Sequence, residues 1–143
     1  MLVSVKYAGP IFTGNFENKL HQAMRNTVTG VGQVAKDAAI ADYLNKKKSQ
    51  PKIPSTIVNS FTYDIPFSNA LLVHGIVFAG VTPAASAPWA IYVDQGHTLR
   101  NNTWWEGYNF MEAGRQAGED VAKKIAMYEL RKLSKASLVE PYY

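Results

Sequence analysis

The sequence predicts a single domain of the α+β class, with an antiparallel sheet of about four strands packed by two long helices. Apolar residues recur at three- and four-residue spacing from Phe16 to Ala38 and again from Phe110 to Tyr128, as on one face of an amphipathic helix. The region between them is rich in β-forming residues and is interrupted by prolines and glycines. The chain has 143 residues, 47% of them hydrophobic and 18% charged, which suffices for one core.

The predicted order of elements is strand, helix, three strands, helix. Residues 3–7 alternate between apolar and polar with the period of a half-buried strand. Residues 13–15 supply cap residues for the first helix, whose pattern fades at residues 44–45. Gly30 and Gly32 lie inside this helix and are poor helix formers, so we expect a kink there or a close approach by another backbone.

The middle of the chain predicts three strands. Residues 57–65 alternate and end at Pro66, residues 71–79 form a nearly continuous apolar run, and residues 89–93 form a last strand before a turn. A polar and aromatic loop follows at residues 99–107. The second helix then begins at Phe110, with Asn109 as its expected cap.

A basic segment separates the first helix from the strands. Residues 45–55 combine lysines with prolines and cannot pack into a core, so we expect a mobile loop. Its lysines are Lys46, Lys47, Lys48 and Lys52. They suit either a partner subunit or a phosphate backbone, and the net charge of +4 permits nucleic-acid contact without requiring it.

Aromatic residues gather at two places in the C-terminal third of the chain. Trp104 and Trp105 lie in the loop, where they either plug the end of the core or anchor a protein interface. Tyr142 and Tyr143 end a tail at residues 137–143 that has no helical pattern and follows the domain of residues 1–136. Aromatic residues in a tail favour the interface interpretation.

The residue types that enzymes use are sparse. There is no cysteine, which excludes disulfides, thiolate metal sites and cysteine nucleophiles. His21, His74 and His97 do not show metal-ligand spacing, and no serine lies in a G-x-S-x-G turn. Asp94 followed by His97 is the pair that most resembles a catalytic site. We expect no enzymatic activity, no metal and no cofactor.

The sequence also bears on the compartment. Its longest apolar runs are too short to cross a bilayer, and residues 1–6 lack the pattern of a signal peptide. These features predict a soluble protein made in the cytoplasm.

Part of the sequence resembles the neck, or tail-completion, proteins of long-tailed bacteriophages. Residues 89–96, a loop and then residues 110–113 match a family pattern in which a strand ending in acid, aromatic, glycine and threonine precedes a helix led by phenylalanine. Residues 53–61 are similar to the proline-and-threonine segment that leads into the family's first central strand. Gln95 and His97 depart from the family's aromatic and threonine. The similarity extends over roughly residues 16–133.

This resemblance implies a structural role in the virion. The family members form rings, commonly six-fold, at the joint between head and tail. The implied partners are copies of this chain and the neighbouring connector and tail-tube proteins, and the genome passes through the ring. The tail-terminator family has a similar architecture and is an alternative. Two other classes remain: a small basic protein that binds nucleic acid, and an enzyme centred on Asp94 and His97.

Overall fold

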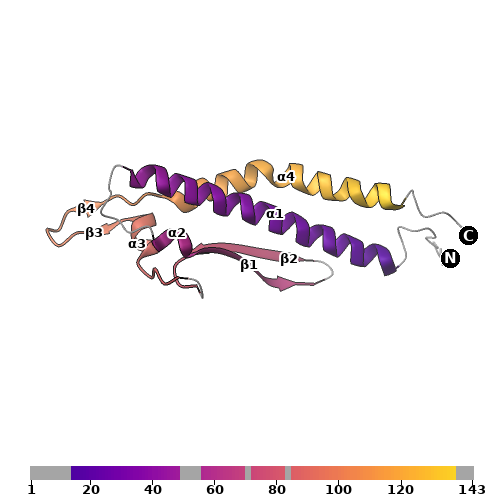
Figure 1. Cartoon of the computed structure of the whole chain (residues 1–143), viewed down its shortest axis with the longest axis horizontal. Coiled ribbons are helices and arrows are strands. Elements are labelled where there is room, and N and C mark those ends of the chain that lie inside the picture. The colour runs from indigo at the N-terminus through magenta and orange to yellow at the C-terminus, as the bar shows by residue number, and fades with distance from the viewer. Residues whose placement is uncertain (1–13, 49–55, 70–71, 83–84, 138–143) are drawn as a thin grey trace, which may run out of the picture.

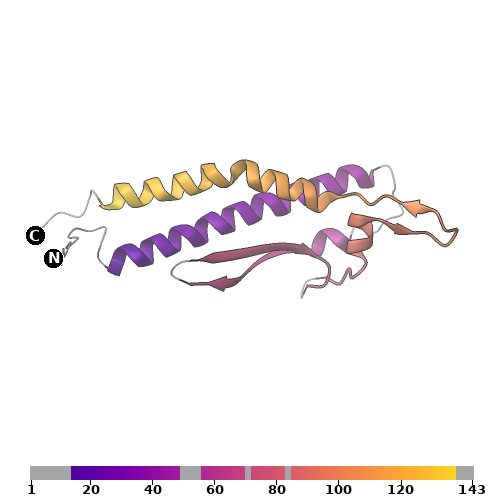
Figure 2. The ribbon, with the colours of Figure 1, turned by 180° about the vertical axis from the view of Figure 1, so that it is seen from behind.

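The computed structural model describes residues 14–48, 56–69, 72–82 and 85–137. Helix α1 (Gly14–Lys47) lies between helix α4 (Phe110–Ser137) and a hairpin formed by β1 (Phe61–Ser68) and β2 (Val73–Ala79), as Figures 1 and 2 show from opposite sides. The structure therefore mixes helices and antiparallel strands, as the α+β prediction requires.

The described strands do not form the single four-stranded sheet that we expected. They form two separate antiparallel pairs, β1 with β2, and β3 (His97–Thr98) with β4 (Trp104–Trp105). The predicted third strand at residues 89–93 is instead a short helix, α3 (Ala90–Gln95). Its buried residues Ala90, Val93 and Asp94 are spaced as on one face of a helix, and an apolar run this short fits either structure.

The start of the middle region also differs from the prediction. Residues 57–59 belong to a helical turn, α2 (Thr56–Asn59), and the Ser60 hydroxyl donates a hydrogen bond of 2.7 Å to the Ile57 carbonyl at its end. Strand β1 continues past Pro66 to Ser68 because its pairing with β2 shifts register between Asp64 and Phe67. Such a bulge accommodates a proline within a strand.

Helix α1 is continuous through its two glycines. Both glycines mark close packing against side chains of other elements. A Cβ atom on Gly30 would lie 3.3 Å from the Ile125 side chain of α4, and one on Gly32 would lie 3.4 Å from the Tyr63 ring of β1. The helix extends to Lys47, two residues beyond the predicted end at residues 44–45.

Helices α1 and α4 approach each other most closely where α4 carries small residues. A Cβ atom on Gly114 would lie only 2.6 Å from the Ala35 carbonyl oxygen, and one on Gly118 would lie 3.3 Å from the Ala35 side chain. Close backbone approach of this kind needs glycine at the contact. It fixes the crossing point of the two helices.

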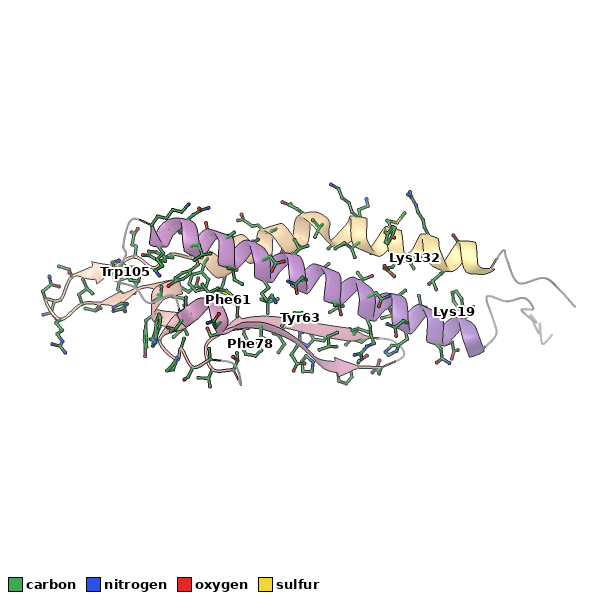
Figure 3. All side chains as sticks on the ribbon, viewed as in Figure 1. Lys19, Phe61, Tyr63, Phe78, Trp105 and Lys132 are labelled. Carbon is green, nitrogen blue, oxygen red and sulfur yellow. The ribbon has the colours of Figure 1, made fainter. Side chains whose placement is uncertain are left out.

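The buried core is concentrated at one end of the elongated molecule. Tyr43 of α1 contacts the rings of Tyr108 and Phe110, and Phe61 packs against Phe110 at a centroid distance of 5.3 Å. Figure 3 shows Phe61 toward this end, with Lys19 and Lys132 toward the other. The cluster consists of Ala39, Tyr43, Ile57, Phe61, Ala87, Ala90, Val93, Tyr108 and Phe110. Of the buried hydrophobic residues, only Ala23 and Val73 lie outside it among the described residues.

Several predictions fall outside the described residues. They are the strand at residues 3–7, the part of the basic loop at residues 49–55 that includes Lys52, and the tail residues Tyr142 and Tyr143. Helix α4 extends through Ser137, the first residue of the predicted tail. In the described part of the chain, no helix has the length and apolar character needed to cross a membrane.

Candidate assembly surfaces

The turn that carries Asp94 holds the beginning of α4. Asp94 Oδ1 accepts a hydrogen bond of 3.0 Å from the Met111 backbone N–H, and the Asp94 carbonyl accepts one of 2.8 Å from the Asn109 N–H. A carboxylate at a helix N-terminus satisfies an otherwise unpaired donor and interacts favourably with the helix dipole. Asp94 therefore performs the capping role that the sequence assigned to Asn109, whose φ of 53° is left-handed.

Two glycines allow the segment that ends in this turn and the segment that leads into α4 to lie side by side. Gly96 has a φ of 86°, and a Cβ atom on Gly107 would overlap the Asp94 carbonyl. The Tyr108 N–H donates a hydrogen bond of 2.8 Å to the Val93 carbonyl. The turn is thus clamped to the segment that leads into α4, and Phe110 is fixed in the core.

The two tryptophans of β4 have different environments, and only Trp105 fits the prediction of a ring that closes the end of the core. Trp105 is half-buried, with its ring centroid 5.4 Å from those of His97 and Tyr108. It closes the end of the core. Trp104 is 62% exposed. Exposed Tyr92 of α3 lies at the same end of the molecule, so this end presents large rings to solvent.

The basic segment is more structured than predicted over its first residues. Lys46 and Lys47 lie in the last turn of α1, and Lys48 follows it in a turn. The Lys46 Nζ pairs with Asp42 and donates a hydrogen bond of 2.5 Å to the Tyr108 carbonyl. It ties α1 to the chain before α4. The Lys48 Nζ donates a hydrogen bond of 3.3 Å to Asn45 and is exposed.

The structure does not bring Asp94 and His97 together as an acid–base pair. The Asp94 carboxylate is directed to Met111, whereas His97 Nδ1 lies 3.3 Å from the Tyr92 carbonyl. Elsewhere, His21 Nε2 lies 2.7 Å from the Ser68 hydroxyl, and His74 is exposed on β2. Among the described residues, no three histidine or carboxylate side chains are grouped to hold a metal ion.

Sequence analysis missed the outer face of the β1–β2 hairpin. One face of the hairpin lies on α1, and the other presents four large apolar side chains to solvent. They are Phe67, Leu72, Ile76 and Phe78. Ile76 and Phe78 alternate along β2, and Leu72 directly precedes this strand. A nearly continuous apolar run such as residues 71–79 is typical of a strand that is covered on both faces. That signal was present in the sequence.

Comparison of the chain with protein-family models, with curated proteins and with solved structures gives no match in any of the three. The assignment of a function therefore rests on the residues themselves and on their geometry.

Proposed function

We propose that this chain is a structural virion protein of a long-tailed bacteriophage, a ring-forming neck or tail-completion component that joins the tail to the head connector. The observation that carries the proposal is that residues matching the pattern of the phage family have structural roles in this chain. Asp94 caps α4, Gly96 adopts a positive φ that favours glycine, and Phe110 is fully buried. A pattern whose residues have these roles is typical of a shared fold and does not indicate a catalytic site.

The distribution of exposed side chains supports assembly over catalysis. Trp104 and Tyr92 are exposed at one end of the molecule, and the hairpin exposes Ile76 and Phe78 along its flank. Aromatic residues are enriched at protein interfaces, and clustered apolar residues on a surface mark interaction sites. A subunit of a ring that also joins two other structures needs several such surfaces.

Within this proposal, copies of this chain form the ring, and connector and tail-tube proteins contact its two ends. The genome passes through without specific binding, since tight phosphate contacts would impede its movement. Lys46 is already paired within the chain, which lowers the number of cations available for DNA. A gel-shift titration against salt tests this point: weak binding is expected, and tight binding with a steep salt dependence would favour a nucleic-acid-binding protein.

A phage whose copy of this gene carries a stop codon tests the neck role. We expect its lysates to contain DNA-filled heads and finished tails that are not joined, and added purified protein should restore joining. Tails of uncontrolled length in the same lysate would instead indicate a tail terminator. Normal infectious particles would contradict both roles.

The exposed end of the molecule provides a sharper version of this assay. Trp104→Ala should fold normally and fail to restore joining, because it removes a ring that is exposed in the single subunit. Thr98→Ala is the matched control, since Thr98 is the exposed partner of Trp104 in the β3–β4 pair. If the Trp104→Ala variant joins heads and tails as well as wild type does, this end of the molecule is not part of the interface.

A further inference from the structure

The second half of α4 buries a charge where an amphipathic helix usually buries apolar side chains. Among the described residues 119–134, the one buried side chain is that of Glu129, which is 8% exposed. In the first half, by contrast, Phe110 is fully buried in the core, and Gly114 and Gly118 lie closely against α1. The two halves of α4 are therefore held by different kinds of contact.

Glu129 joins the second half of α4 to α1 through a small polar network. Its carboxylate accepts hydrogen bonds of 3.1 Å from Asn26 Nδ2 of α1 and of 2.7 Å from Lys132 Nζ. The bonds from Lys132 and Asn26 lower the pKa of the Glu129 carboxyl, so this group is charged at neutral pH. A buried carboxylate is costly when it loses a partner. We call the contact between Asn26 and Glu129 the latch.

Helix α1 has other contacts in this half of the molecule, because the hairpin lies along it. A Cβ atom on Gly75 of β2 would overlap the Val28 side chain, so strand and helix approach closely there. Nearer the start of α1, His21 Nε2 lies 2.7 Å from the Ser68 hydroxyl at the end of β1. We therefore expect α1 to stay covered by the hairpin even when the second half of α4 moves.

The crossing of the two long helices provides a pivot for such a movement. Helices α1 and α4 approach most closely at Gly114 and Gly118 and diverge toward their other ends, as Figures 1 and 2 show. A hollow of about 220 Å³ lies beside the latch, lined mainly by apolar side chains that include Leu20, Val28 and Leu130. Glycine is a poor helix former, so Gly118 also weakens α4 at the boundary between its two halves.

We propose that residues 119–137 of α4 form an arm that opens away from α1 as a unit, with its pivot at Gly118, and that the latch controls how often the arm opens. The core stays closed, because Phe110 and Gly114 lie on the other side of the pivot. A detached helix of this length is marginal in water, so its backbone amides exchange with solvent while the arm is open. The inference is independent of the proposed function.

Hydrogen exchange of the full chain, resolved by peptic peptides and mass spectrometry, tests for the arm. After correction for intrinsic rates, residues 119–134 should exchange at least about tenfold faster at neutral pH than residues 110–118 of the same helix. They should also exchange faster than residues 21–30 of α1. The second comparison separates an arm from fraying, because fraying would loosen the start of α1 and the end of α4 alike and would decrease gradually along each helix.

Variants of the latch test what controls the opening. Asn26→Ala removes the donor on α1 and should speed exchange of the arm by about tenfold. Gln33→Ala is the matched control and should change nothing in the arm, because Gln33 donates a bond of 2.8 Å to Asp37 within α1. Asn26→Asp brings two carboxylates together and should open the arm further. Glu129→Gln in that background restores a donor and should return the rates toward those of wild type.

A variant at the other end of α4 completes the test. Asp94→Ala weakens the core end but should leave exchange of the arm unchanged, because the opening of the arm does not break that contact. Circular dichroism checks that each variant keeps its helix content. Equal protection on the two sides of Gly118, a gradual increase in exchange toward the ends of both helices, or an arm that Asn26→Ala leaves unchanged would each overturn the proposal.

Discussion

Asp94 is the residue whose role differs most from its first interpretation. In the sequence it belongs with His97 to the pair that most resembles a catalytic site. In the structure it is buried and bonded to the first turn of α4. The sequence alone could not show this, because the capped helix begins sixteen residues later, across the β3–β4 pair.

Removal of the Asp94 carboxylate should destabilise the fold. Asp94→Ala leaves the Met111 N–H without its acceptor, and we expect a loss of about 1–2 kcal/mol in the free energy of unfolding. Asp94→Asn keeps an acceptor and should lose less. Urea denaturation followed by circular dichroism measures both, with Asp120→Ala on the exposed side of α4 as the control. Equal stability of Asp94→Ala and wild type would contradict the capping role.

The two neighbouring tryptophans should respond differently to truncation. Trp105→Ala removes a half-buried ring from the end of the core and should lower stability by about 3 kcal/mol, whereas Trp104→Ala should change it by less than about 0.5 kcal/mol. Thermal melting of the two variants against wild type provides the comparison. Sequence reasoning could not separate the pair, because the alternation of faces in a two-residue strand is fixed only by its partner.

Tyr43 should make stability depend on alkaline pH. Burial, with a smaller effect of nearby Tyr108, raises the pKa of Tyr43 from 10.0 to about 12. Because the folded-state pKa lies above the unfolded value, the stabilisation is complete below pH 10 and is lost as the pH rises toward 12. Melting temperatures measured from pH 8 to 11.5 should fall more steeply in wild type than in Tyr43→Phe. Parallel curves would show that this hydroxyl does not titrate with unfolding.

At the scale of elements, the long helices were predictable and the short elements were not. Helix α1 and helix α4, which begins at Phe110, have enough turns for the helical period of their apolar residues to be recognised in the sequence. Residues 89–93 are too few to distinguish a strand from a helix, and only the clamp to Tyr108 and Asn109 reveals how they are held. Strand β1 extends past Pro66 because a bulge accommodates it, which no local signal indicated.

The crossing of α1 and α4 should depend on Gly114. Gly114→Ala improves intrinsic helix propensity by about 1 kcal/mol, yet its Cβ atom would lie 2.6 Å from the Ala35 carbonyl oxygen. We therefore expect a net loss of stability and a lower melting temperature. Gly30→Ala is the control, since its Cβ atom would meet the end of the adaptable Ile125 side chain, and it should be close to neutral. A Gly114→Ala variant more stable than wild type would contradict this packing.

At the scale of the whole molecule, the sequence predicted the class but not the surfaces. The α1 stripe was expected to be covered by a sheet of about four strands. Only a two-stranded hairpin lies on it in the described structure, and two hollows lined mainly by apolar side chains remain along α1 between α4 and β2. How much of the apolar stripe of α1 is covered depends on how many strands pair with one another. Long-range contacts determine that number, and the periodicity of the sequence does not show them.

The position of this protein in a finished particle tests the neck role most directly. The proposed neck role predicts that, in purified virions of the encoding phage labelled with antibody and gold and imaged by electron microscopy, the label lies at the joint between head and tail. Cryo-electron microscopy of the same particles should show a ring there into which the hairpin and the two long helices fit. Virions without the protein, or with label only at the distal end of the tail, would contradict the account.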